Sequence, residues 1–363
     1  MNIFVFGSSI LSSYWNGAAT YYRGCYKYLS RMGHHITFAE PDAYGRQQRR
    51  DEGDLSYVNS IVYQPGGGFM EMLDRAAGAD IVIKHSGIGV EDEAIERRIL
   101  ELQQESVVVF WDVDAAATLA RMNADRADAL RSLVPKYDAV FTYGGGPWCR
   151  EQYLALGARA YFSIYNGLDP ETHFPVPSDP ELACDVAFLG NRLPDREARV
   201  EELFLHAAEL SPRGRFLLGG EGWGDKPMPA NVRYIGHVPT ADHNRVNCSA
   251  GMVMNINRAS MAQAGFSPPT RVFEAAGAGT CLLCDDWPGI DECFDPGKEI
   301  LVVRTAQDVA DAIATCDEDE RRRIGERFHN RALRDHSYEQ RAIQADAALR
   351  HCLGLRAETL ASL

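Results

Sequence analysis

The strongest constraint on the fold is a repeated alternation of short apolar runs with longer amphipathic stretches. In the first half of the chain the apolar runs end at glycine or polar residues, and the segments between them carry apolar residues at helical spacing. This pattern is typical of a parallel sheet covered by helices on both faces. Expected strands are 2–6, 36–39, 81–84, 107–111 and 139–142, and expected helices include 18–32, 91–104 and 121–133.

The same alternation restarts after a proline-rich segment. Residues 175–180 (Pro-Val-Pro-Ser-Asp-Pro) lack periodicity, and prolines favour extended backbone, so we expect a linker there. Beyond it, strands are expected at 185–191, 215–218, 232–235, 251–255, 280–284 and 300–303, with a helix over 195–210. We therefore predict an α/β protein with two Rossmann-like, doubly wound domains, 1–174 and 181–337, facing each other across a cleft. The final helix, within 338–363, is expected to cross back to the first domain.

Charge argues against a nucleic-acid partner. The chain has 37 lysines and arginines against 51 acidic residues, a formal net charge of −14, which repels a phosphate backbone. No run approaches the roughly 20 apolar residues of a membrane span. The first residues, Met-Asn-Ile-Phe-Val-Phe-Gly, lack the basic start of a signal peptide. We expect a cytoplasmic protein without a transmembrane segment.

Nine scattered cysteines do not form a disulfide framework. Cys281 and Cys284 make a CxxC pattern, but they lie in the apolar run 280–284, which favours a buried strand. No second pair is present to complete a zinc site.

The segment 254–294 carries the clearest functional pattern. Ser267 is expected to cap a helix whose first residue is Pro268. The free N–H groups and the dipole at such a terminus suit a diphosphate. Glu274 follows on the same helix, where a carboxylate can accept hydrogen bonds from sugar or ribose hydroxyls.

These residues resemble a known family. Segments 257–261 (Asn-Arg-Ala-Ser-Met), 265–276 (Gly-Phe-Ser-Pro-Pro-Thr-Arg-Val-Phe-Glu-Ala-Ala), 285–290 and 296–300 are similar to the C-terminal half of CgeB-like, spore-maturation-type glycosyltransferases of the GT-B superfamily. Segments 15–17, 19–23, 33–34, 111–114 and 188–191 extend the likeness over most of the chain. The resemblance implies a nucleotide-sugar donor in the second domain and an acceptor in the first.

The resemblance also implies site residues. Glu274 would bind the ribose, Ser267, Thr270 and Arg271 would flank the diphosphate, and Arg192 would reach the same phosphates. The full donor set is Gly190, Asn191, Arg192, Gly236, His237, Val238, Asn257, Arg258, Ser267, Thr270, Arg271 and Glu274, and the acceptor set is Ser8, Trp15 and Tyr22. Many retaining members carry two glutamates in an E-x7-E pattern. The first of these positions is Phe266 here, so retention of configuration is not implied.

An inverting transfer needs a base near the acceptor hydroxyl. The candidates are Asp112 and Asp114, at the end of the fourth expected strand, and His85, after the third. Two other interpretations stay open: both aspartates can cap the helix that starts near Ala115, and His85 and His237 can be structural. Asp112-Val113-Asp114 also matches a metal-type DxD, but the superfamily generally works without metal, so neither metal nor cofactor is expected.

We therefore expect a metal-independent glycosyltransferase of the hexosyltransferase type, which moves a sugar from a nucleoside-diphosphate sugar to an acceptor hydroxyl. The acceptor is left open among small molecules, glycans and proteins, and nothing selects the donor base. A nucleotide-sugar epimerase and a non-catalytic sugar- or nucleotide-binding protein are the alternatives. A nicotinamide-dependent dehydrogenase is excluded, because Gly7-Ser8-Ser9-Ile10 lacks the GxGxxG pattern.

Overall fold

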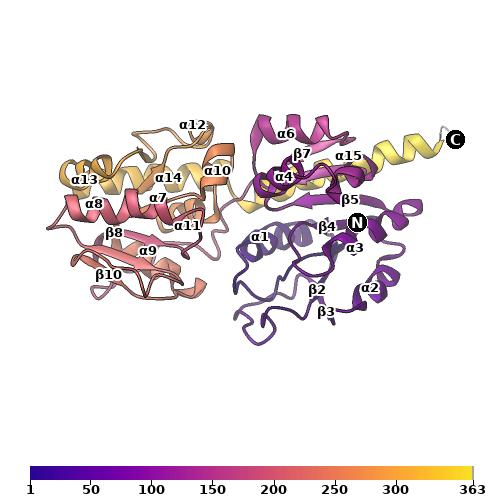
Figure 1. Cartoon of the computed structure of the whole chain (residues 1–363), viewed down its shortest axis with the longest axis horizontal. Coiled ribbons are helices and arrows are strands. Elements are labelled where there is room, and N and C mark those ends of the chain that lie inside the picture. Colours follow the sequence, from indigo (N-terminus) through magenta and orange to yellow (C-terminus); the bar gives the residue numbers. More distant parts are fainter. Residues whose placement is uncertain (362–363) are drawn as a thin grey trace. The chain divides into compact units, whose positions relative to one another are not determined.

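The chain folds into two α/β units (Figure 1). The computed structural model describes residues 1–361. Unit 1 is formed by residues 1–166 together with the C-terminal segment from 338, and unit 2 is formed by residues 167–337. This division lies eight residues before the predicted boundary at 174. The expected linker is attached to unit 2: the Val176 N–H donates to Cys248 Sγ, and the Asp179 N–H donates to Ser249 Oγ at 2.7 Å.

Unit 1 contains a seven-stranded parallel sheet in the order β3-β2-β1-β4-β5-β6-β7. Ile3 of the central strand pairs with Ile36 on one side and Ile81 on the other, so apolar residues meet across the sheet. The strands are β1 (Asn2–Phe6), β2 (His35–Pro41), β3 (Asn59–Tyr63), β4 (Ile81–His85), β5 (Val107–Asp112), β6 (Ala139–Thr142) and β7 (Tyr161–Ser163).

Helices cover both faces of this sheet. One face packs on α1 (Ala18–Arg31) and on the last helix, α15 (Tyr338–Ala361), which lies against α1. The other face packs on α2 (Gly68–Ala76), α3 (Asp92–Arg98), α4 (Ala115–Ala124), α5 (Ala129–Leu133) and α6 (Gly146–Ala155). Short 3-10 turns at Ile99–Gln104 and Val134–Lys136 complete the unit. Successive strand residues point to opposite faces, which is why strands buried on both sides have unbroken apolar sequences.

Unit 2 repeats the plan with six parallel strands in the order β10-β9-β8-β11-β12-β13. The strands are β8 (Cys184–Leu189), β9 (Phe216–Gly219), β10 (Val232–Tyr234), β11 (Ala250–Asn255), β12 (Leu282–Asp285) and β13 (Leu301–Val303). The predicted fold class, two parallel-sheet Rossmann-like α/β domains, is confirmed.

The helices of unit 2 also lie on both faces. One core includes α9 (His243–Ser249), α11 (Thr270–Ala278), α12 (Ile290–Cys293) and part of α14 (Glu318–Asp335). The other includes α7 (Glu197–Val200), α8 (His206–Leu210) and α13 (Ala306–Thr315), and α10 (Ala259–Ala264) follows β11. A π-helical turn, Glu201–Leu205, joins α7 to α8, and a 3-10 turn, Thr240–Asp242, precedes α9.

The strand order places a ligand site in each unit. In unit 2 the order reverses between β8 and β11, and open α/β sheets bind ligands beyond the carboxyl ends of the strands at such a switch point. The residues that follow these two strands are Gly190 and, after Ile256, Asn257 and Arg258. The switch point of unit 1 lies between β1 and β4.

Several sequence predictions differ from the structure. The helix predicted over 121–133 is wrong: α4 ends at Ala124, and Asp128 caps the separate helix α5 by accepting a hydrogen bond from the Leu130 N–H. Strands β3 and β7 were not predicted. Their residues are mostly half-buried, and β7 has only three residues, so neither strand has a long apolar run. Cys281 and Cys284 pack into the two opposite cores of unit 2, so they cannot chelate one ion together.

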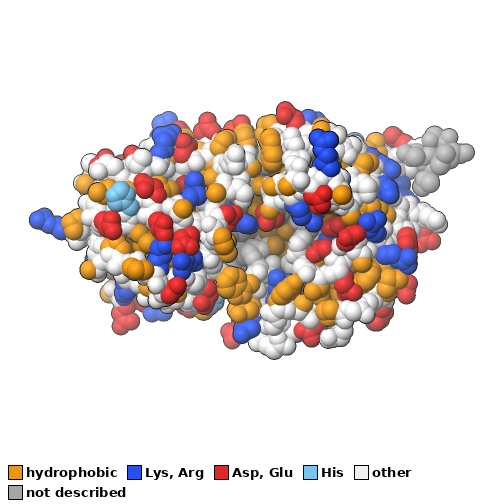
Figure 2. Space-filling model, in the orientation of Figure 1, with side chains coloured by type: hydrophobic (Ala, Val, Ile, Leu, Met, Phe, Trp, Pro, Cys, Tyr) orange, Lys and Arg blue, Asp and Glu red, His pale blue; other side chains and the backbone are white. Residues whose placement is uncertain are grey.

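Among residues 1–361, none of the helices combines the length and the apolar character that crossing a membrane requires. On the face drawn in Figure 2, acidic and basic side chains are interspersed over each unit, and a continuous basic band is not visible there.

Candidate functional site

Two half-buried arginines, Arg196 and Arg271, meet at the carboxyl end of β8. A Cβ atom built on Gly190 would lie 3.2 Å from Nη1 of Arg196 and 3.3 Å from Nη1 of Arg271, so both guanidinium groups border this glycine. The Nε atoms of both arginines are buried without a hydrogen-bond partner. Arg271 also lies over the ring of Phe188, 5.4 Å from its centroid. The geometry leaves positive charge and unused donors at the place where the fold predicts a ligand.

Electrostatics confirm that this charge is concentrated. Burial, together with the positive charges of Arg271 and Arg258, lowers the pKa of Arg196 to about 10. Burial also lowers the pKa of Arg271. Arg196 remains protonated at neutral pH, since a pKa of about 10 lies far above it. Three like charges held this close favour an anion that can be shared between them.

Carboxylates hold the rest of this region in place. Asp195 accepts two hydrogen bonds from Nε of Arg258, at 2.8 and 3.1 Å, and Asp285 accepts the Asn257 N–H at 2.9 Å. Burial raises the pKa of Asp285, although Arg199 forms an ion pair with it at 2.7 Å. The predicted residues Asn257 and Arg258 are thus anchored beside the arginine pair.

Arg192 is engaged elsewhere. Its guanidinium group forms ion pairs with Glu197 at 2.7 Å and Asp225 at 2.9 Å. Arg196, to which the sequence pattern did not point, borders Gly190 instead. Arg192 and Arg196 are four positions apart in the sequence. Which of them borders Gly190 depends on the tertiary positions of Glu197 and Asp225, which sequence spacing alone does not reveal. The neighbouring Asn191 accepts the Glu221 N–H through its side chain at 2.9 Å.

The start of α11 differs from the prediction. The helix begins at Thr270 with Pro269 as its N-cap, and the Ser267 hydroxyl donates to the Gly265 carbonyl at 3.0 Å instead of capping the helix. The predicted cap at Ser267 and first helical residue at Pro268 are therefore wrong. The physical reason is that a residue before proline is pushed into extended backbone, so Pro268 cannot begin a helix while Pro269 follows it. The free N–H groups lie at Thr270 and Arg271, beside the arginine pair.

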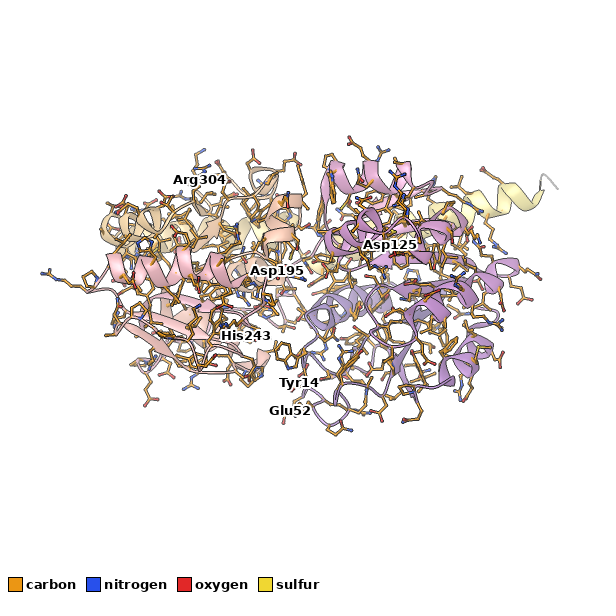
Figure 3. All side chains as sticks on the ribbon, in the orientation of Figure 1. Tyr14, Glu52, Asp125, Asp195, His243 and Arg304 are labelled. Carbon is orange, nitrogen blue, oxygen red and sulfur yellow. The ribbon has the colours of Figure 1, made fainter. Side chains whose placement is uncertain are left out.

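Glu274 lies in the second turn of α11 and is buried. One of its oxygens lies 3.1 Å from Nδ1 of His243. Burial alone would raise the pKa of Glu274, but His243, His173 and Arg271 together hold it well below its usual range. Glu274 is therefore an ionised, buried acceptor. Figure 3 labels Asp195 and His243, which lie toward the same end of unit 2, whereas Arg304 lies away from them.

The predicted base-binding turn, 236–238, lies nearby. Gly236 has a positive φ of 73°, and its carbonyl accepts the Gly220 N–H at 2.7 Å. The Val238 carbonyl lies 3.3 Å from Nε2 of His243, so this turn is connected to Glu274 through His243. His237 is exposed.

In unit 1, Asp112 is completely buried at the end of β5. Its carboxylate accepts hydrogen bonds from Ser86 Oγ at 2.6 Å, Thr118 Oγ1 at 3.0 Å and the Asp114 N–H at 2.9 Å, and also from the Tyr153 hydroxyl. These donors come from the residue after β4, from the N-cap and body of α4, and from α6. A carboxylate with four donors and no exposed surface holds the ends of these elements together, and it has no room for an acceptor hydroxyl.

His85 is also part of the core. Its Nε2 lies 2.6 Å from the Tyr26 hydroxyl and its Nδ1 lies 3.2 Å from the Trp111 carbonyl. Burial lowers the pKa of His85 to about 3. Asp114 is more exposed and precedes α4, but its side chain makes no capping hydrogen bond. Of the three candidate bases, Asp114 is the one that is not buried.

The predicted acceptor residues have different surroundings. The Ser8 hydroxyl donates to Asn16 Oδ1 at 3.0 Å, and the Tyr22 hydroxyl lies 3.5 Å from Ser8 Oγ inside the core. Tyr22 is fully buried, whereas Trp15 is 53% exposed and has a positive φ of 47°. A bulky residue in the left-handed region is strained. Trp15 is therefore the member of this set that is available to a ligand.

Comparisons with known proteins agree with this fold. The profile of the family described as "Glycosyl transferase-like" matches residues 196–347. Sucrose-phosphate synthase from Thermosynechococcus elongatus is 14% identical with a TM-score of 0.71, covering 98% of this chain and 100% of that one. Anabaena HepE in complex with UDP and glucose is 14% identical with a TM-score of 0.68, and its complex with UDP-glucose is 15% identical with a TM-score of 0.62, each covering 100% of both chains. No match was found among curated proteins.

At these identities the structural likeness shows the fold, which is that of GT-B glycosyltransferases. The family profile covers the arginine pair, Asn257, Arg258 and the whole of α11, which places the candidate site inside the matched segment.

Proposed function

We propose that this protein is a glycosyltransferase that moves a sugar from a nucleoside-diphosphate sugar to an acceptor hydroxyl without a metal ion. The observation that carries the proposal is the pair of arginines, Arg196 and Arg271, with buried, unused Nε donors beside the N-terminus of α11. The match of residues 196–347 to a glycosyltransferase family supports it. Because HepE, one of the similar structures, binds UDP-glucose, we propose a UDP-sugar as donor.

The chemistry gives these groups a role. When the bond from the sugar to the diphosphate breaks, negative charge grows on the leaving nucleoside diphosphate. Preorganised cations and helix N–H groups stabilise such charge more than they stabilise the ground state. Arg196, Arg271 and Arg258 supply cations, and the first turn of α11 supplies N–H groups. A bound metal is not needed for this task if three arginines share the diphosphate.

Glu274 would recognise the ribose. It lies about one turn further along α11 than Arg271, and its ionised carboxylate can accept hydrogen bonds from two hydroxyls. On the acceptor side we propose Asp114 as the base, because Asp112 and His85 are buried in complete hydrogen-bond networks. Trp15 offers an exposed ring on which an acceptor can stack.

The test is calorimetric titration of the full-length protein with UDP. Arg271→Ala removes a charged donor from the proposed diphosphate site, which is worth about 1.5–3 kcal/mol, so UDP affinity should fall about 10- to 100-fold. Arg304→Ala is the matched control: it removes an exposed arginine of the same unit that pairs with Asp286, and UDP affinity should not change.

A second readout is release of UDP from UDP-glucose in the presence of acceptor mixtures, with analysis of the sugar product. Transfer gives free UDP and a glycosylated acceptor, whereas epimerisation leaves the nucleotide attached to the sugar. The proposal is wrong if wild-type protein binds no nucleoside diphosphate at millimolar concentration, or if Arg271→Ala binds UDP as tightly as the wild type.

A further inference from the structure

Three side chains that can bind a metal ion meet beside α11 in unit 2. Glu274 comes from α11, His243 is the first residue of α9, and His173 lies in the turn before the proline-rich segment. One potential ligand atom from each residue lies within 4.8 Å of the other two. His173 and Glu274 are buried, and the His243 side chain is 17% exposed. The cluster is therefore shielded from most competing solvent.

The ring nitrogens of the two histidines have different surroundings. Nε2 of His173 is buried without a hydrogen-bond partner, which is unfavourable unless a ligand uses this nitrogen. Nε2 of His243 lies 3.3 Å from the Val238 carbonyl, and Nδ1 lies 3.1 Å from Glu274. A histidine that donates one N–H to a backbone carbonyl is typical of metal ligands, because the carbonyl fixes the ring and its tautomer.

The chain makes room for this arrangement. A Cβ atom on Gly277 would lie 2.6 Å from both Cβ and the carbonyl oxygen of His173, so only glycine lets His173 approach α11. Glycine inside a helix is less favourable than alanine, so the close approach of His173 has a cost in helix stability. The turn that carries His173 is also fixed, because Asn244 Nδ2 donates to the Thr172 carbonyl at 2.9 Å. The three ligand residues are thus held by neighbouring rigid elements.

We propose that His173, His243 and Glu274 form a binding site for a divalent transition-metal ion of the zinc type. Two imidazoles and one carboxylate are a ligand set that zinc accepts, with a fourth position for water. Bonds of about 2.0–2.1 Å in a tetrahedron place ligand atoms about 3.4 Å apart. The His243–Glu274 pair, at 3.1 Å, is already close to this spacing. The ligand atom of His173 lies within 4.8 Å of the other two ligand atoms, so it has to move toward them by about 1.4 Å at most. The ion replaces the proton between His243 Nδ1 and Glu274, and that proton leaves to solvent.

This inference goes beyond the proposed function but touches it at one residue. If Glu274 binds the ribose of the donor, as proposed above, a metal ion on the same carboxylate competes with the nucleotide. The ion would then be an inhibitor of donor binding and not a participant in transfer. Metal binding is measured without nucleotide, so its failure and the failure of the proposed function are separate results.

The experiment uses the full-length protein after removal of metals with a chelator, titrated with Co²⁺ and, in parallel, with Zn²⁺. Cobalt bound by nitrogen and oxygen ligands should give visible absorption without the strong near-ultraviolet band of a thiolate complex. Glu274→Gln, His173→Asn and His243→Asn should each weaken binding by about 100-fold or more, since even residues behind the ligands change affinity 10- to 100-fold. Mg²⁺, which prefers oxygen ligands, should not compete.

The matched control is His206→Asn. His206 forms a histidine–glutamate pair with Glu202 in the same unit, at 3.6 Å, but both side chains are about half exposed and belong to no three-ligand cluster among residues 1–361. This variant should bind cobalt as the wild type does. Three results would each overturn the proposal. They are a cobalt spectrum dominated by thiolate ligands, absence of cobalt binding to the wild type, and ligand variants that all bind cobalt as tightly as the wild type. The spectrum of the wild type decides even if a variant does not fold.

A second titration adds UDP to the cobalt complex. Loss of the visible absorption supports overlap of the metal and nucleotide sites at Glu274. Simultaneous binding of both ligands would remove the competition but keep the metal site.

Discussion

The role of His85 can be tested through the pH dependence of stability. The ring lies at the end of β4, where Tyr22 packs 4.4 Å from it and Trp111 packs 5.4 Å from it, and both ring nitrogens face partners inside the core. The adjacent Lys84 adds a positive charge, although Lys84 itself pairs with Asp92 and Glu96. A protonated imidazole at this position would therefore be poorly solvated and close to a cation.

The magnitude follows from the two pKa values. Burial lowers the pKa of His85 from 6.5 to about 3 in the native state. The folded pKa is below the unfolded one, so the unfolded state takes up a proton first as the pH falls, and stability is lost below about pH 6.5. Each pH unit costs about 1.4 kcal/mol, so between pH 7.5 and pH 5.0 this histidine should remove about 2 kcal/mol of unfolding free energy.

The perturbation is His85→Gln, which cannot titrate. At pH 7.5 the variant should be less stable than the wild type by about 1–3 kcal/mol, because hydrogen bonds to Tyr26 and the Trp111 carbonyl are disturbed. At pH 5.0 the difference in unfolding free energy should be smaller by about 2 kcal/mol, since only the wild type is destabilised by protonation of His85 in the unfolded state. Hydrogen–deuterium exchange of the β4 segment gives these differences, and comparison at equal pH cancels the intrinsic exchange chemistry.

His35→Gln, an exposed position of the same unit, is the control for replacing a histidine by glutamine. A difference between His85→Gln and the wild type that stays constant from pH 7.5 to 5.0 would refute the reasoning. It would mean that His85 keeps an ordinary pKa and is accessible to water, as a catalytic base has to be.

Two further substitutions test the packing around the candidate sites. Asp112→Asn should destabilise unit 1 by about 2–4 kcal/mol in urea denaturation, because an amide cannot accept hydrogen bonds from all four donors of Asp112. Asp114→Asn should change the free energy of unfolding by less than about 0.5 kcal/mol. If Asp114 is the base, this variant should lower the transfer rate about 100-fold. Equal stability losses would contradict this division. Gly277→Ala should destabilise unit 2 by about 1–3 kcal/mol despite the higher helix propensity of alanine, because the alanine Cβ would meet His173. A variant more stable than the wild type would show that this contact relaxes without cost.

The sequence was sufficient to predict the strands that are buried on both faces of the sheets. β1, β4, β5, β6 and β11 have continuous apolar runs, and their predicted bounds differ from the structure by at most one residue. β3 and β7 lie at the edges of the unit 1 sheet and are mostly half-buried, so they lack such a run. The break between α4 and α5 depends on Asp125 and Asp128, whose side chains accept hydrogen bonds from nearby backbone N–H groups and so compete with a continuous helix. The spacing of apolar residues does not reveal this competition.

The candidate site was predictable where its residues are neighbours in sequence. Arg271 and Glu274 share one helix, so one motif identified both. His173 lies 101 positions before Glu274, and His243 lies 31 positions before it, so no local spacing connects them. The local signal for His173 was its place two residues before the proline-rich segment 175–180. The position of His173 against α11 results from the fold of unit 2, in particular from the turn that Asn244 holds.

The distribution of charge along α11 explains why one helix can serve two kinds of ligand. Its first turn joins N–H groups to the cations of Arg271 and Arg196, and its second turn carries the carboxylate of Glu274 between two imidazoles. A nucleoside diphosphate would use both turns, because its phosphates are anionic and its ribose carries hydroxyl donors. A zinc-type cation would use only the second turn, since the arginines of the first repel it. Replacing Arg271 should therefore affect the nucleotide alone, whereas replacing Glu274 should affect both ligands.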